Sequence, residues 1–239
     1  MNKNLIAGLI VVVAGSAGFL AYRASHTGQG PVTAVPQPAS PAPTPGGDVV
    51  EADAQSPKKP VVPDSLPDIT LADLDGKPTQ LASFGGRPLM INFWATWCAP
   101  CRREIPLLNK IRVQRQVQNA EIVGVAVDFK EDVLKFLKKT PLSYPLLIGE
   151  EDGLAAASAF GMGMAFPFSV FVDSQNRILT IKVGELHEDE ANFAFDRLQD
   201  IDKGVLTREA AQMAVAEAFR TMAAERARQE AASASHSGS

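Results

Sequence analysis

The only two cysteines of the chain, Cys98 and Cys101, lie three positions apart and are its clearest candidates for chemistry. Two thiols at this spacing can close a disulfide at the start of a helix, and Pro100 between them is tolerated in a first helical turn. The unpaired N–H groups and positive dipole end of that helix would lower the pKa of the Cys98 thiol. We expect Cys98 to be exposed and to attack disulfides, and Cys101 to be shielded and to resolve the mixed disulfide.

Other uses of the two thiols are less well supported. A structural zinc site needs four ligands, and none of the three histidines has ligand spacing to the cysteines. We therefore expect no metal site and no cofactor, although Cu(I) held by the two thiolates is an alternative, because soft thiolates suit Cu(I). The net charge of −4 argues against a nucleic-acid partner.

Glu104 follows Cys101 by three positions, so the two side chains would share one face of the helix. A carboxylate there could exchange a proton with the Cys101 thiol. The alternative is a solvated glutamate favoured by the helix dipole. Arg102 and Arg103 could favour the Cys98 thiolate or attract acidic partners. The simpler interpretation is a charged solvent face, which would also include Lys110, Arg112 and Arg115.

The elements that must position these residues are predicted from hydrophobic patterning over 66–203. Two continuous apolar runs, 88–94 and 121–127, predict buried strands. A hairpin is expected around Asp75-Gly76, and a helix from Pro100 to about Gln118 with a kink at Pro106. Further expected elements are a helix at 131–139, a brief strand at 146–148, a helix at 153–160, strands at 169–172 and 177–183, and a helix at 188–201. This order predicts an α/β fold with a mixed sheet flanked by helices.

The two ends of the chain differ from this middle part. The uncharged run at 5–22 predicts a signal-anchor helix within 1–24, and a cleaved signal peptide is the alternative. Ten of the 17 prolines fall between Pro31 and Pro67, so 25–65 is expected to be an extended linker. The Ala-rich segment 204–239 predicts a helix packed loosely on the domain and then a disordered tail from about Ala232, or alternatively a partner-binding helix.

The segment from Phe93 to Pro106, FWATWCAPCRREIP, resembles the active-site segment of the TlpA/ResA group, the membrane-anchored thioredoxin-like proteins of bacterial envelopes. The resemblance extends over 66–203 and includes Phe166-Pro167-Phe168-Ser169. It implies a thioredoxin fold, a catalytic domain in the periplasm and a single-pass inner-membrane tether. It also implies a proton-exchanging acid at Glu104 and a cis-proline at Pro167 whose loop pairs with substrate, a trans turn proline being the alternative. Trp97 and Phe166 are the expected substrate-binding residues.

Two positions depart from thioredoxin itself. Thioredoxin has a buried aspartate on the strand before the motif, where this chain has Asn92, and a lysine on the next strand, where it has Gly124. Since the usual buried proton acceptor is missing, Glu104 is expected to take its place.

The pair between the cysteines, Ala99-Pro100, is close in character to that of reducing thioredoxins and predicts a reductant. The family implies a membrane electron donor of the DsbD type. It also implies protein disulfide substrates in apocytochrome c or in copper-carrying proteins that load the respiratory oxidase. An oxidant or isomerase on the same fold, and a Cu(I)-carrying binding module, are the alternatives.

Overall fold

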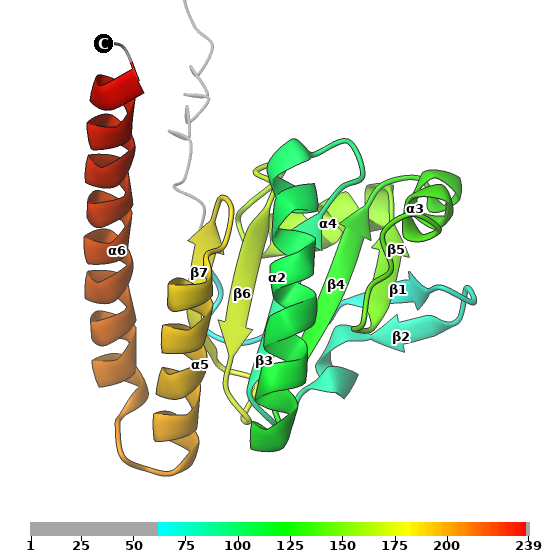
Figure 1. Cartoon of the computed structure of the whole chain (residues 1–239). Helices are drawn as coiled ribbons and strands as arrows, with labels where there is room; N and C mark the ends of the chain where they lie inside the picture. Colours follow the sequence, from blue (N-terminus) through cyan, green and yellow to red (C-terminus); the bar gives the residue numbers. More distant parts are fainter. Residues whose placement is uncertain (1–61, 238–239) are drawn as a thin grey trace, which may run out of the picture. The chain divides into compact units, whose positions relative to one another are not determined.

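Figure 1 shows the computed structural model of the chain, which describes residues 62–237. The predicted signal-anchor and nearly all of the predicted linker lie outside these residues. Within the described part, no helix is both long enough and apolar enough to cross a membrane.

The described residues form one mixed sheet with the strand order β2-β1-β5-β4-β3-β6-β7. At its centre, β3 (Leu89–Trp94) and β4 (Glu121–Val127) run parallel and are buried along their whole length, as their continuous apolar runs predict. The strand β5 (Leu146–Gly149) extends the parallel part, and β6 (Phe168–Val172) pairs antiparallel with β3.

Three more strands complete the two edges of the sheet. One edge is the predicted hairpin of β1 (Thr70–Asp73) and β2 (Pro78–Gln80), whose turn contains Gly76 at a φ of 84°. The opposite edge is β7 (Ile178–Val183), which pairs with β6. A single 3-10 turn, η1 (Leu81–Phe84), follows β2.

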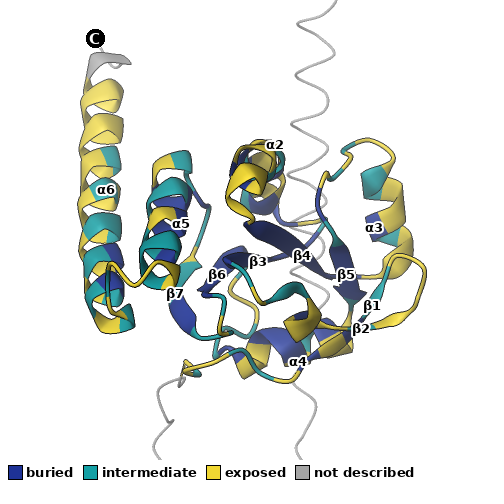
Figure 2. Ribbon diagram, turned by 90° about the horizontal axis from the view of Figure 1, so that it is seen from below, coloured by how far each residue is buried: buried dark blue, intermediate teal, exposed yellow. Residues whose placement is uncertain are grey.

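Helices cover both faces of the sheet, as Figure 2 shows from below. The helices α2 (Ala99–Arg115), α3 (Lys130–Leu137) and α5 (Glu188–Asp202) pack on one face, and α4 (Glu151–Ala159) packs on the other. A stacked pair, Phe93 and Phe168, lies in the core on the α4 side, whereas Phe171 and Phe195 meet in the core on the α5 side. The predicted mixed sheet with flanking helices is confirmed.

The helix that carries the cysteines differs slightly from its predicted bounds. It begins at Ala99, with Cys98 as its N-cap, and Pro106 lies inside it. It ends at Arg115, and a 3-10 turn, η2 (Gln116–Gln118), completes the segment that was predicted to be helical.

The long C-terminal helix α6 (Arg208–Ser237) packs beside α5 and β7 (Figure 1). Only its first part is buried, through Ala211 and Val215, and 227–235 are exposed throughout. Met213, between these two positions, is 70% exposed. The helix also extends to Ser237, beyond the point at which the disordered tail was expected.

Candidate active site

Cys98 and Cys101 are joined in a disulfide at the start of α2, with their Cα atoms 5.3 Å apart. The strand β3 ends at Trp94, and a short turn then places Cys98 at the N-cap of the helix. There its sulfur accepts a hydrogen bond from the Cys101 backbone N–H at 3.3 Å. The helix start therefore directs a backbone donor at the sulfur, an arrangement that favours a thiolate in the reduced protein.

Cys98 is more exposed than Cys101, as predicted, but it is less exposed than we expected. Cys101 is fully buried, and Cys98 is only 6% exposed. Cys98 is not the openly exposed residue that we expected, because Trp94, Ala95 and the partly buried Phe166 belong to the apolar cluster around the disulfide. A partner disulfide must therefore reach the small part of Cys98 that is exposed.

Two aromatic rings from separate loops meet next to the disulfide. Trp97 is 59% exposed and lies edge-on to Phe166, with ring centroids 6.1 Å apart. Phe166 also stacks on Phe168 at the start of β6. The Phe166–Pro167 peptide bond is cis, the geometry that the resemblance implied, and Pro167 is buried.

Glu104 is 2% exposed, so the alternative of a solvated first-turn glutamate is wrong. Its Oε1 accepts a hydrogen bond from Asn92 Nδ2 at 2.8 Å, and its Oε2 accepts one from the Leu186 backbone N–H at 2.8 Å. Burial is the largest influence on this carboxyl and raises its pKa to about 7, although both hydrogen bonds favour the ionised form. A group with such a pKa can both accept and donate a proton at neutral pH.

The strand positions beside Glu104 explain why it is held there. Asn92 is fully buried on β3 and also donates to Ser169 Oγ at 3.1 Å. Gly124 is the register partner of Asn92 on β4, and a Cβ there would lie 2.9 Å from Leu146 Cδ1. The site therefore has a neutral amide and no side chain at the two positions where thioredoxin has charged residues, which leaves Glu104 as the buried acid.

Ser169 and Leu186 are site residues that sequence reasoning missed. Leu186 contributes a backbone N–H from a loop 82 positions away, and no side-chain pattern could have identified it. Ser169 does interrupt an otherwise apolar strand, and this interruption was an available signal.

The basic residues of α2 do not form the single solvent face that we expected. Arg115 is buried because Asp196 and Asn192 of α5 accept hydrogen bonds from its guanidinium, and Arg112 binds Glu121 at 2.7 Å. The other pairs are more exposed: Arg103 binds Glu185 and Lys110 binds Glu188. Arg102 is exposed.

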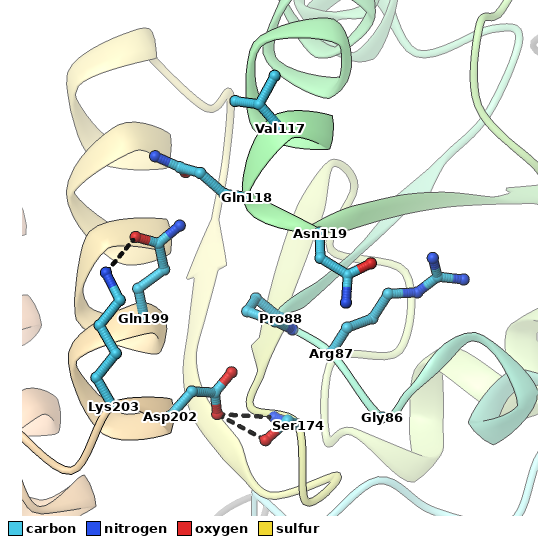
Figure 3. Close-up of a pocket in the computed structure, with 10 residues that line it drawn as sticks. All are labelled: Gly86, Arg87, Pro88, Val117, Gln118, Asn119, Ser174, Gln199, Asp202 and Lys203. Carbon is cyan, nitrogen blue, oxygen red and sulfur yellow. Dashed lines mark hydrogen bonds between the residues drawn. The ribbon is translucent and has the colours of Figure 1, made fainter.

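The rest of the described chain adds no second reactive centre. Among the described residues, no group of three or more His, Cys, Asp or Glu side chains could hold a metal ion. His187 is the N-cap of α5. Figure 3 shows a hollow whose lining includes Arg87, Pro88, Asn119, Ser174 and Asp202. It lies at the opposite end of β3 from Cys98, because Pro88 directly precedes that strand and Cys98 follows it.

A Cys-x-x-Cys disulfide at a helix start, beside a cis-proline and on a mixed sheet with helices on both faces, defines the class of thioredoxin-fold thiol-disulfide oxidoreductases. The Redoxin family matches residues 62–195, and the chain belongs to that family.

Known proteins agree with this assignment. The thiol-disulfide oxidoreductase ResA of Geobacillus thermodenitrificans is 32% identical over 127 residues, which cover 53% of this chain and 71% of that protein. A thiol:disulfide interchange protein of the thioredoxin family from Chlorobium tepidum TLS has a TM-score of 0.50 at 26% identity, covering 57% of this chain and 96% of the other. A putative thiol:disulfide interchange protein DsbE from Chlorobium tepidum, at 23% identity, has a TM-score of 0.53 over 56% of this chain and 95% of the other, and shows the fold alone. The predicted likeness to the TlpA/ResA group is confirmed, and the chain is a thiol-disulfide oxidoreductase.

Proposed function

We propose that this protein is an envelope reductase that transfers electrons to specific protein disulfides through Cys98 and Cys101. The observation that carries the proposal is the place of Cys98 at the N-cap of α2, with the Cys101 N–H directed at its sulfur. The segment 1–24 would hold the protein in the bacterial inner membrane as a single-pass anchor, and 25–65 would let the catalytic domain stand off in the periplasm.

The reaction begins with both cysteines reduced. The Cys98 thiolate attacks one sulfur of the substrate disulfide, which forms a mixed disulfide and releases the other substrate sulfur as a thiolate. Cys101 then loses its proton and attacks the Cys98 sulfur. This step releases the second substrate sulfur and leaves the Cys98–Cys101 disulfide, so that the substrate has gained two electrons and two protons.

Glu104 is the proposed proton acceptor for Cys101 in the second step. Its carboxyl has a pKa of about 7 and lies one helical turn beyond Cys101 on α2. In the oxidised protein there is no thiol proton to accept, and the carboxylate is held by Asn92 and Leu186. After turnover, a membrane donor of the DsbD type would return two electrons to the disulfide.

The expected substrates are disulfides in apocytochrome c or in copper-carrying proteins that load the respiratory oxidase. The loop at Phe166 and Pro167 would pair with an extended substrate segment, and Trp97 would pack against it. The Ala99-Pro100 pair supports the direction of transfer, since it is close in character to that of reducing thioredoxins.

Substrate trapping tests this proposal. In Cys101→Ser the mixed disulfide with Cys98 cannot be resolved, so envelope substrates should accumulate as covalent adducts that dithiothreitol releases. The matched variant Cys98→Ser retains the buried thiol and should trap nothing. Equal trapping by the two variants, or no adduct in either when the wild-type protein reduces envelope disulfides, would contradict the assigned roles.

A further inference from the structure

Thr96 and Asp128 follow the two central strands and meet beside the turn that leads to Cys98. The strands β3 and β4 are parallel, and Trp94 pairs in register with Ala126, so the chain leaves both strands at the same edge of the sheet (Figure 1). The Thr96 backbone N–H donates to Asp128 Oδ2 at 2.9 Å, and Thr96 Oγ1 donates to the same oxygen at 2.5 Å. One carboxylate oxygen therefore holds both donors of Thr96.

Asp128 is only 8% exposed, and its charge is satisfied by hydrogen bonds. Its other oxygen, Oδ1, accepts a hydrogen bond from the Phe129 backbone N–H at 2.9 Å. Over 62–237, no lysine, arginine or histidine forms a salt bridge with Asp128. A buried carboxylate is costly unless it is hydrogen-bonded, and hydrogen bonds to a charged acceptor are roughly twice as strong as neutral ones. Asp128 is therefore anchored to the turn and not to a neighbouring cation.

The turn between β3 and α2 loses one of its restraints during catalysis. The Cys98 N–H donates to the Ala95 carbonyl oxygen at 3.2 Å, and the Cys98 carbonyl oxygen accepts from the Arg102 N–H at 3.2 Å. In the oxidised protein the disulfide to Cys101 also holds Cys98. Reduction removes this covalent restraint at the stage when Cys98 must attack a substrate disulfide. The bonds to the Asp128 carboxylate then take a larger share in fixing the turn.

We propose that Asp128 is a positioning residue of the disulfide exchange, which acts through Thr96 to keep the Cys98 sulfur of the reduced protein against the Cys101 N–H. The inference rests on the proposed role of Cys98 as the attacking thiol. In the disulfide form this N–H donates to the sulfur at 3.3 Å. A shift or rotation of the turn would weaken that bond, and with it the stabilisation of the Cys98 thiolate.

A direct electrostatic effect of Asp128 would act in the opposite direction. A carboxylate near Cys98 disfavours the thiolate and raises the pKa of the thiol, whereas a turn held in place favours the thiolate. The hydroxyl of Thr96 separates the two effects, because Thr96→Val removes one bond to the carboxylate without changing any charge.

The test is the pH dependence of iodoacetamide alkylation of Cys98 in the reduced full-length protein, which reports the midpoint of thiolate formation. We expect this midpoint to rise by about 0.5 pH unit in Thr96→Val, because the sulfur loses part of the stabilisation from its backbone donor. Thr96→Ser keeps the hydroxyl and should restore the wild-type midpoint. Thr79→Val, which removes a hydroxyl hydrogen bond from the edge strand β2, should leave the midpoint unchanged.

A double-mutant cycle tests whether Asp128 is the partner through which Thr96 acts. In an Asp128→Ala background, Thr96→Val should shift the midpoint by less than about 0.2 pH unit, since the acceptor of the hydroxyl is already absent. Asp128→Asn, whose single oxygen cannot hold both Thr96 and Phe129, serves if Asp128→Ala does not fold, and should also reduce the shift. An unchanged or lowered midpoint in folded Thr96→Val, or the same shift with and without the carboxylate, would overturn the proposal.

The proposed function is judged separately, by substrate trapping. If Thr96→Val raises the midpoint and the Asp128 background abolishes this shift, but Cys101→Ser traps no substrate, then Asp128 still positions Cys98 and the proposed reductase fails.

Discussion

Asn92 donates a hydrogen bond to Glu104 across 2.8 Å, and both side chains are buried between β3 and α2. A neutral amide at this point holds the carboxyl in place without adding a second negative charge beside it. The pKa of this carboxyl, about 7, follows mainly from burial, and the nearby Glu185 raises it further. The relationship gives the site a single buried acid whose proton is exchangeable at neutral pH.

The raised pKa of Glu104 predicts a pH-dependent contribution to stability. Folding raises this pKa from 4.5 to about 7, so the contribution is fully present below pH 4.5 and is lost as pH rises through 7. The free energy of unfolding of the oxidised wild-type protein, relative to Glu104→Gln, should fall by about 3 kcal/mol between pH 4.5 and pH 8. Urea unfolding of both proteins without reductant measures this difference. If the free energies of unfolding of the two proteins changed with pH in the same way, the raised pKa of Glu104 would be contradicted.

Gly124 is predicted to tolerate no larger side chain. A Cβ at this position would lie 2.9 Å from Leu146 Cδ1 and 3.1 Å from Tyr144 Cε2, both in the buried interior. Gly124→Val should lower the free energy of unfolding by about 1–3 kcal/mol, and Gly124→Ala by less. Gly153→Ala is the matched control, since its Cβ would meet nothing closer than 3.4 Å and alanine favours the helix α4. Denaturant unfolding of the three variants checks the order, and a stable Gly124→Val would show that this space is not filled.

Trp97 is predicted to contribute to the binding of protein substrates and not to the reactivity of the Cys98–Cys101 disulfide. Its ring is largely exposed beside Phe166, so it can bury area against a docked partner. Trp97→Ala should lower kcat/KM for a trapped protein substrate about fivefold or more, while its reaction with dithiothreitol changes less than twofold. Val117→Ala, an exposed apolar position in η2, serves as the control. An equal loss in the two reactions would mean that Trp97 supports the disulfide itself.

Much of the fold was predictable from sequence because the patterns are strong. The strands β3 and β4 are continuous apolar runs, and the hairpin turn contains Asp75-Gly76, so each has a local physical cause. The helix start at Cys98 followed from Pro100 and the spacing of the cysteines. The three-residue spacing also placed Glu104 on the helix face of Cys101, but it could not decide whether that face was buried.

The features that sequence reasoning missed depend on contacts between distant segments. Arg115 is buried only because α5 brings Asp196 and Asn192 to it, and Leu186 reaches Glu104 from a loop. Cys98 is covered because the loop that contains Phe166 packs over the disulfide. Helix α6 has weak apolar patterning, so its buried positions could not be chosen before α5 and β7 were in place.

The direct test of the central claim is the midpoint reduction potential of the Cys98–Cys101 pair. The purified protein is equilibrated in dithiothreitol or glutathione redox buffers, and the reduced fraction is read by thiol alkylation. We predict a midpoint near that of thioredoxin, at about −270 mV, where the reduced pair can pass electrons to substrate disulfides. A midpoint near about −120 mV, that of a strong disulfide oxidant, would contradict the reductase.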